Sequence, residues 1–341
     1  MSAAACIAEI KSLRLNHARF DLAYRRAYSH AALSAPSQLI VVCGPTRVGK
    51  TTLARRLTAE LVATKGRGND DGIIPLIRVE AATTNQGKFS TKHFTLRMLE
   101  ELHDPITTIG DSISLRRNQS ETHLRLQLER CLRYRGTRYI LVDEAQHLLR
   151  TTSQLRTGEV IDTLKCLANV SDLTVILIGG YELLNACIQS SHLNGRLTIV
   201  DFPPYGTDVE SSREFDRILK AIEQKIPSKP GLLVDHREAL YAGSLGCVGL
   251  LMGWAMKALA EMHAQAHREL HFRHLQATRL AIQNQAIADE IALGARLLGW
   301  AHPSCVSAVT VNRSPSPSLK RATRPFVRKP HRDPGPNTSM A

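Results

Sequence analysis

The sequence predicts an α/β fold, in which a three-layer αβα sandwich surrounds a parallel five-stranded sheet and a purely helical lid follows. Five short apolar runs alternate with helical patterns up to about residue 202. Strands that alternate with helices are typical of a parallel sheet covered on both faces. After Pro203 and Pro204 the strand patterns stop and only helical patterns continue. We therefore expect one sandwich with a helical lid subdomain behind it.

The predicted strands are short apolar runs, as expected for buried strands of a parallel sheet. They cover residues 39–43, 73–79, 138–142, 174–178 and 197–202. Helical patterns cover residues 1–35, 52–63, 92–102, 121–134, 211–226, 248–264 and 275–298. In the lid, Ser211 with Glu214 matches the S-x-x-E capping box, and Asp235 with Glu238 suggests a second helix start.

These patterns divide the chain into four parts. Residues 1–35 form an N-terminal helical extension, 36–205 the sandwich core, 206–300 the helical lid and 301–341 a basic tail. The tail is rich in Pro, Ser and Arg and has no hydrophobic periodicity, so we expect it to be disordered.

The charge of the chain points to a polyanionic partner. The 341 residues carry a formal net charge of +13, of which the segment from Pro303 onward contributes +6. An excess of this size most often indicates nucleic acid, although a basic tail also inflates the total. The seven cysteines contain no C-x-x-C pair, which favours a reducing cytoplasmic location without disulfides or a zinc site. The sequence shows no signal-peptide pattern and no apolar run of about 18 residues, so we expect no membrane partner.

A phosphate-binding loop follows the first predicted strand. Residues 44–51 read GPTRVGKT and fit the pattern G-x-x-x-x-G-K-[ST] between an apolar strand and a helix. Such a loop turns its N–H groups toward phosphates at a helix N-terminus. We expect ATP to contact Gly44, Pro45, Thr46, Arg47, Val48, Gly49, Lys50, Thr51 and Thr52. Lys50 would reach the β and γ phosphates, and the hydroxyl of Thr51 would bind Mg²⁺.

Two acidic residues end the third predicted strand, which reads YILVDE over residues 139–144. Asp143 would hold the Mg²⁺ shell, and Glu144 would orient and polarise the attacking water. His147 follows in the string DEAQH, and we expect it to have a structural or coupling role rather than to bind a metal.

Together these motifs resemble AAA+ ATPases, and the resemblance implies further residues. Arg196, just before the fifth strand, stands where AAA+ proteins carry an arginine finger that reaches the nucleotide of a neighbouring subunit. Where relatives place a polar sensor, Gly179 and Gly180 follow the fourth strand, so Tyr181 or Glu182 would substitute or sensing would be weak. The lid reads GCVG at residues 246–249 and lacks the usual sensor arginine, which implies slow, regulatory hydrolysis.

A finer resemblance covers roughly residues 10–295. The strings GPTRVGKTTL, YILVDEAQHLL, VILIGGYELL, NGRL and YAGSLGCVGLLMGWAMKALAE are similar to the TniB and TnsC regulators of bacterial transposition. The resemblance implies ATP-dependent rings or filaments on double-stranded DNA, target-site selection with a targeting protein or CRISPR effector, and recruitment of a transposase.

The segment after the second strand is the first candidate for DNA contact. It is polar and contains Thr84, Lys88 and Lys92, whose donors suit phosphate oxygens, and Arg116 with Arg117 is the second candidate. Contacts of this kind predict sequence-tolerant binding.

Two other functions stay open. One is a helicase loader or replication initiator, and the other is a scaffold or signalling ATPase that does not bind DNA.

A series of histidines at positions 263, 267, 271 and 274 has near-helical spacing, but no acidic or sulfur ligand completes a metal set, and we expect a solvated lid face.

Overall fold

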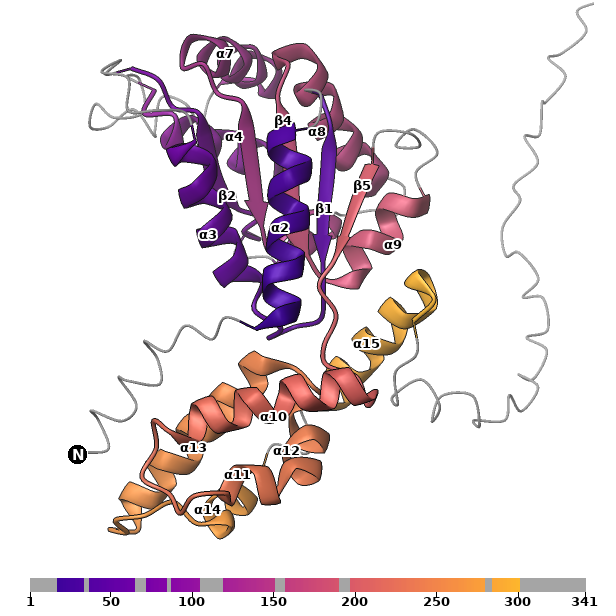
Figure 1. Cartoon of the computed structure of the whole chain (residues 1–341). Coiled ribbons are helices and arrows are strands. Elements are labelled where there is room, and N and C mark those ends of the chain that lie inside the picture. The colour runs from indigo at the N-terminus through magenta and orange to yellow at the C-terminus, as the bar shows by residue number, and fades with distance from the viewer. Residues whose placement is uncertain are drawn as a thin grey trace, which may run out of the picture.

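A computed structural model describes residues 17–33, 37–64, 72–84, 87–104, 119–150, 157–189, 197–279 and 284–300. Figure 1 shows two parts: a sheet covered by helices, and a group of helices below the lower edge of that sheet. The expected α/β sandwich followed by helices is confirmed.

The sheet has five parallel strands in the order β2-β3-β4-β1-β5. The strands are β1 (Leu39–Cys43), β2 (Leu76–Glu80), β3 (Tyr139–Asp143), β4 (Thr174–Gly179) and β5 (Leu197–Asp201). Because all strands run the same way, their carboxyl ends meet at one edge, where α/β sheets bind ligands. The chain passes from β1 to β2 at the opposite edge of the sheet and returns through β3. Strand β4 then fills the place between β3 and β1.

The second strand begins later than predicted. Residues 73–75 lie outside β2, which starts at Leu76 and continues to Glu80. Pro75 has no N–H to donate to a ladder, and its carbonyl instead accepts hydrogen bonds from the N–H groups of Arg138 and Tyr139, at 2.9 and 3.1 Å. The proline therefore sets the start of this strand.

Helices cover both faces of the sheet, as the alternation of side chains in each strand requires. One face packs against α2 (Ala18–Leu33) and α3 (Lys50–Ala63), around Phe20, Leu53 and Leu57. The other face packs against α4 (Thr91–Glu101), α7 (Glu121–Tyr134), α8 (Thr157–Ser171) and α9 (Tyr181–Gln189). A short 3₁₀ helix, η1 (Ala145–Leu149), follows β3 directly.

The helices after the sheet enclose a hydrophobic core of their own. They are α10 (Val209–Glu223), α11 (Leu232–Asp235), α12 (Arg237–Ser244), α13 (Val248–Ala264) and α14 (Phe272–Ala277), packed around Phe215, Leu251 and Trp254. The last described helix, α15 (Asn284–Leu298), returns to the sandwich, where Leu293 and Leu297 pack against the core beside α9. The single helix expected over residues 275–298 is thus wrong, since α14 ends at Ala277 and α15 begins at Asn284.

Both predicted helix starts in the lid are also wrong. The N-cap of α10 is Asp208, whose side chain accepts a hydrogen bond from the Ser211 N–H at 2.8 Å, because Val209 already has helical geometry. Ser211 is buried inside the first turn instead of capping it. Asp235 ends α11, and α12 starts after His236 without a side-chain cap.

No single helix among the described residues is long and apolar enough to cross a membrane, and α12 and α13 reach that length only together, across a 112° bend.

Candidate functional site

The P-loop joins β1 to α3 at the carboxyl edge of the sheet. Strand β1 is buried along its whole length, and α3 starts at Lys50. Two glycines fix the path of the loop. Gly49 has a φ of 122°, in the region that glycine favours, and a Cβ on Gly44 would lie 2.4 Å from the carbonyl oxygen of Phe202. The loop therefore wraps the N-terminus of α3, where the N–H groups and the helix dipole favour an anion.

Lys50 lies inside this loop. Its Nζ donates hydrogen bonds to the carbonyl oxygens of Gly44 and Pro45, at 2.8 and 2.9 Å. Burial lowers the pKa of the Lys50 ammonium, while the nearby carboxylates of Glu290 and Glu144 raise it. The cation thus faces acidic groups from both the sandwich and α15.

The two acidic residues at the end of β3 lie at the same edge. Asp143 is buried, its Oδ2 accepts from Arg78 of β2 at 2.6 Å, and its Oδ1 accepts from the Glu144 N–H at 3.0 Å. Glu144 has a left-handed backbone with φ 52°, which ends the strand and begins η1. The Asp143 carboxylate and the Thr51 hydroxyl are oxygen donors of the kind that Mg²⁺ prefers, so the chemistry of these residues fits that ion.

Strand β4 ends between these two loops without a polar side chain of its own. The space beside Gly179 and Gly180 is filled by side chains from elsewhere. A Cβ on Gly179 would lie 2.8 Å from Oε1 of Gln146, and one on Gly180 would lie 2.7 Å from Oε1 of Glu290. Close packing therefore requires glycine at 179, where the buried Leu183 and the backbone of Gln146 also lie near, whereas the only near group at 180 is the end of the flexible Glu290 side chain.

Gln146 of η1 bridges the two strand ends. Its Nε2 donates to Oε2 of Glu144 at 2.5 Å, and its Oε1 accepts from the N–H of Gly180 at 3.2 Å. The side chain thus connects the acidic end of β3 to the bare end of β4.

Glu290 of α15 reaches the P-loop itself. Its Oε2 accepts a hydrogen bond from the N–H of Thr46 at 2.9 Å. This residue lies 244 positions away in the sequence, and no motif in α15 marks it. The pair of glycines is the only sequence signal that a side chain from elsewhere would be needed there.

Of the two residues proposed as substitute sensors, Tyr181 contacts Asp201 and Glu182 is exposed. Tyr181 is fully buried, and its hydroxyl donates to Oδ1 of Asp201 at 2.9 Å. Burial raises the pKa of both groups, that of Asp201 to about 6 in spite of this hydrogen bond. Glu182 is exposed on α9. Neither side chain belongs to the contacts around Lys50 and Glu144 described above.

The lid touches the P-loop through a third glycine. The N–H of Gly249, in the first turn of α13, donates to the carbonyl oxygen of Arg47 at 2.8 Å. A Cβ on Gly249 would lie 2.3 Å from that oxygen. A side chain at this position would separate the lid from the loop, which gives a physical reason for glycine where the resemblance to AAA+ proteins implies a sensor arginine.

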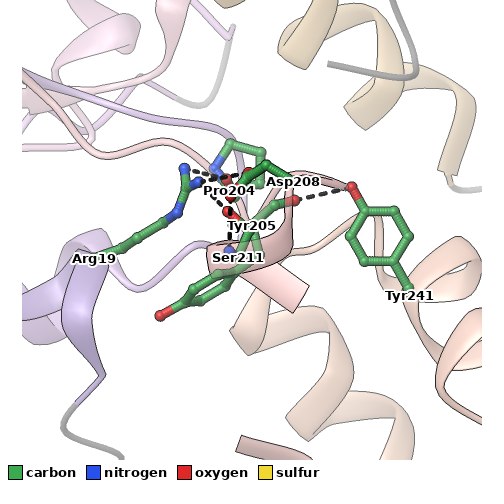
Figure 2. A network of polar contacts seen from close by, with 6 residues as sticks. All are labelled: Arg19, Pro204, Tyr205, Asp208, Ser211 and Tyr241. Atoms are coloured by element: carbon green, nitrogen blue, oxygen red, sulfur yellow. Dashed lines mark hydrogen bonds and ion pairs between the residues drawn. The ribbon is translucent and has the colours of Figure 1, made fainter. Parts of the chain in front are cut away.

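Figure 2 shows a network that joins α2 to the segment between the sheet and the lid. Arg19 donates to the carbonyl of Pro204 at 2.6 Å and to the Ser211 hydroxyl at 2.7 Å, and its guanidinium lies over the Tyr205 ring. Tyr241 of α12 donates to the carbonyl of Tyr205 at 3.0 Å. The start of the lid is thus held from both sides.

The first segment proposed for DNA contact follows β2. Its backbone turns back on itself, since the Thr84 N–H donates to the carbonyl of Lys88 at 2.8 Å. Lys88 is exposed, and Lys92 is half-buried in the first turn of α4. The second candidate, Arg116 with Arg117, and the proposed finger Arg196 lie outside the described residues.

His147 connects this segment to the acidic end of β3. Its Nδ1 lies 3.0 Å from the carbonyl oxygen of Ala81, the residue after β2. The Ala81 N–H also donates to the carbonyl of Asp143 at 2.9 Å.

The expectation of a solvated lid face is wrong for His274, whereas His263 and His271 are exposed. His274 is fully buried, its Nε2 lies 3.0 Å from Nδ1 of His267, and its Nδ1 accepts from the N–H of His271 at 3.0 Å. These contacts hold the start of α14. Within the described part of the chain, no three His, Cys, Asp or Glu side chains gather as metal ligands.

Known proteins share this architecture. Residues 35–186 match the family model described as AAA domain, AAA_22. No curated protein matches the chain in sequence. The Orc1 protein of Aeropyrum pernix, solved in complex with DNA, is 17% identical over 82% of this chain and 69% of its own, with a TM-score of 0.57.

Two further structures are similar. The Orc2 protein of Aeropyrum pernix, solved as ADPNP-ADP complexes, is 16% identical over 87% of this chain and 79% of its own, with a TM-score of 0.54. The Cdc6p protein of Pyrobaculum aerophilum is 12% identical over 78% of this chain and 67% of its own, with a TM-score of 0.54. The sheet order, the domain match and these likenesses together identify the fold as the AAA+ sandwich followed by a helical region.

Proposed function

We propose that this protein is an AAA+ ATPase that binds ATP with Mg²⁺ at the carboxyl ends of β1 and β3. The observation that carries the proposal is the P-loop around Lys50 at the same sheet edge as Asp143 and Glu144. The N–H groups of the loop over residues 44–52, apart from Pro45, which has none, and the Lys50 ammonium would bind the phosphates, and Asp143 with Thr51 would hold the ion. Mg²⁺ would neutralise charge on the β and γ phosphates.

Hydrolysis in this scheme depends on Glu144, which accepts a proton from the attacking water and orients it. Lys50 stabilises the charge that develops on the γ-phosphate. Residues 179, 180 and 249 are glycines, where the resemblance to AAA+ proteins implies polar sensor side chains. We therefore propose that ATP hydrolysis is slow and regulates how long the ATP-bound state lasts.

We assign the arginine finger to Arg196, acting on the ATP of a neighbouring subunit. Such a residue contributes roughly 10³-fold or more to hydrolysis. An Arg196→Ala subunit keeps a sound P-loop, and a Lys50→Ala subunit keeps a sound finger. Each variant alone should hydrolyse ATP poorly, and their mixture should recover part of the rate. Failure to recover at any ratio, with co-assembly verified, would count against a shared site.

We propose further that ATP-bound subunits assemble on double-stranded DNA. The net charge of +13 supports a polyanionic partner, and the segment after β2 offers the cations Lys88, which is exposed, and Lys92, which is half-buried. The contact between His147 and Ala81 offers a direct route from the nucleotide to this segment. One subunit makes only a few phosphate contacts, so assembly would supply the avidity that tight binding needs.

The biological role we propose is regulation of DNA transposition. The strings shared with TniB and TnsC proteins support it, and they imply that the assembly selects a target site, with a targeting protein or a CRISPR effector, and recruits the transposase. Replication initiation is the second candidate, because the Orc1 protein of Aeropyrum pernix, similar in fold, was solved in complex with DNA.

Electron microscopy with ATP or ADP, with and without duplex DNA, tests the assembly directly. Rings or filaments that need both ATP and DNA, on unrelated sequences, are the expected result. Assembly confined to one particular DNA sequence would favour a replication initiator. No assembly in any combination would contradict both the transposition regulator and the initiator.

Fluorescence anisotropy over a salt series tests where the DNA binds. Each phosphate neutralised contributes about −0.9 to the slope of log affinity against log salt. Replacing Lys88 and Lys92 by alanine should flatten that slope. Lys220→Ala with Lys229→Ala, an equal loss of charge at two exposed positions of the lid, is the matched control and should leave the slope unchanged. An unchanged slope in the first variant would move DNA contact to the tail or elsewhere.

A further inference from the structure

We propose that Gln146 is a positioning residue for Glu144, in the place of a polar side chain that β4 does not supply. The proposal rests on the ATPase function assigned above and assigns a role that no motif gave to this residue. Its first support is a pair of hydrogen bonds from one side chain. The amide Nε2 donates to Oε2 of Glu144, and the amide oxygen accepts from the Gly180 N–H.

The second support is the packing that this bridge requires. A methyl group at position 179 would lie 2.8 Å from Oε1 of Gln146 and 2.9 Å from Cδ2 of the buried Leu183. Glycine at 179 therefore leaves the room in which the Gln146 amide lies. The amide is fixed at its oxygen end by the sheet, so its nitrogen end holds one oxygen of Glu144 and leaves the other oxygen to accept a hydrogen bond from water.

The role is one of orientation, and isosteric substitution separates it from simple packing. Gln146→Glu keeps the shape and the acceptor for the Gly180 N–H, but it places an anion against Glu144 and removes the donor. Gln146→Ala removes the whole bridge. If the donor matters, both variants should lower kcat for ATP by roughly 10-fold or more, with KM changed less than about twofold.

The measurement is steady-state hydrolysis by the full chain, with ATP affinity determined separately. Gln265→Ala is the matched control, because the Gln265 amide also donates to a carboxylate, that of Glu261, at an exposed place in the lid. It should behave like the wild type. Wild-type kcat in Gln146→Glu, or a higher kcat in Gln146→Ala, would overturn the positioning role. If Glu144→Gln also hydrolysed ATP normally, the result would instead refute the catalytic role of Glu144 in the proposed function.

A different contact carries a second inference: we infer that Glu290 competes with the nucleotide for the P-loop. Its carboxylate accepts from the Thr46 N–H, one of the groups that the loop offers to phosphates, and it is the largest favourable charge acting on Lys50. An anionic side chain in an anion-binding loop must leave when phosphate enters, because two anions cannot share these donors.

The helix that carries Glu290 is docked by other contacts. Ile291 and Ala295 are buried, and a Cβ on Gly294 would lie 2.4 Å from the Tyr181 ring, so α15 lies directly against the start of α9. Displacement of Glu290 by ATP would weaken this docking at its end nearest the loop. The nucleotide state would thus reach α15.

The variant Glu290→Gln tests the competition, with Asp289→Asn as matched control. Asp289 is the neighbouring residue on the same helix, is exposed, and bonds to Gln285. Binding of a fluorescent ATP analogue to Glu290→Gln should be about 3- to 10-fold tighter than to the wild type. In the wild type, the state in which the Glu290 carboxylate occupies the loop reduces the apparent affinity for the nucleotide. Asp289→Asn removes the same charge and should change affinity little.

Hydrogen exchange distinguishes displacement from a general charge effect. ATP should increase amide exchange in α15 of the wild type, and Glu290→Gln should show raised exchange there before ATP is added. Equal or weaker binding of the ATP analogue by Glu290→Gln would overturn the proposal that Glu290 competes with the nucleotide. An amide exchange rate in α15 that is the same with and without ATP would overturn it too. A wild type that binds no ATP at all would instead refute the proposed function.

Discussion

The strand ends at the carboxyl edge of the sheet obtain their polar groups in two ways. Strands β1 and β3 have their chemical groups close by in the sequence: Lys50 follows β1, and Asp143 ends β3 with Glu144 directly after it. Strands β4 and β5 depend on partners that are distant or buried. Gln146 and Glu290 reach the end of β4, and Tyr181 reaches Asp201 at the end of β5. The first pair of strand ends is local in sequence, whereas the second is assembled only by folding.

At the end of β5, the buried Asp201 makes the stability of the protein depend on pH. The folded pKa of Asp201 is about 6, above its ordinary 3.8, because burial disfavours the charged form. Its contribution to stability is therefore complete at low pH and is lost as the pH rises from about 4 to 6. Asp201→Asn should gain roughly 2 kcal/mol relative to the wild type between pH 4 and pH 7. Urea unfolding at a series of pH values measures this.

His17 provides a control with the opposite sign. Burial lowers its pKa to about 4, so its contribution is complete above pH 6.5 and is lost as the pH falls toward 4. His17→Gln should therefore gain relative stability on acidification, by a similar amount. If both variants followed the wild type at every pH, neither group would be shifted by burial as described.

An intermediate effect is expected at Gly179. Gly179→Ala introduces a methyl group that must displace Gln146 and the buried Leu183. We expect a loss of about 1–3 kcal/mol in the free energy of unfolding, since overpacking forces neighbours from their rotamers. Hydrolysis should fall together with Gln146→Ala. Full stability and full turnover would show that the end of β4 tolerates a side chain and that the close packing there is unimportant.

The smallest effect is expected at the neighbouring glycine. A methyl group at Gly180 would meet only the carboxylate of Glu290, the far end of a flexible side chain. Gly180→Ala should therefore leave the free energy of unfolding within about 1 kcal/mol of the wild type. It should tighten nucleotide binding a few-fold, as Glu290→Gln does, in the same fluorescence titration. Weaker binding would mean that the methyl group obstructs the nucleotide rather than the carboxylate.

The same comparison explains what the sequence could predict. Apolar runs identified all five strands, and motifs identified the P-loop and the end of β3, because the residues that make up each of these signals lie within about ten positions of one another. The strand boundary at Pro75 was missed by three residues, since a proline tolerated in a strand pattern has no N–H for the ladder.

The contacts of Gln146 and Glu290 could not be predicted in the same way. Gln146 stands inside a recognised string, yet its hydrogen bond to Gly180 depends on β4 lying beside β3. Glu290 is one acidic residue among many on helices, and only the return of α15 to the sandwich brings it to Thr46. The only local sequence signal was glycine at 179 and 180, where a polar sensor is usual. It indicated that a polar side chain was missing but not which residues lie there.

Nucleotide binding and hydrolysis, measured side by side on two variants, test for a nucleotide site at the carboxyl ends of β1 and β3. Lys50→Ala should lose ATP binding, because the phosphates lose the cation inside the loop. Glu144→Gln should bind ATP as the wild type does and hydrolyse it at least about 100-fold more slowly, because the water loses its base. Normal binding by Lys50→Ala, or normal phosphate release by Glu144→Gln, would contradict a nucleotide site at the ends of β1 and β3.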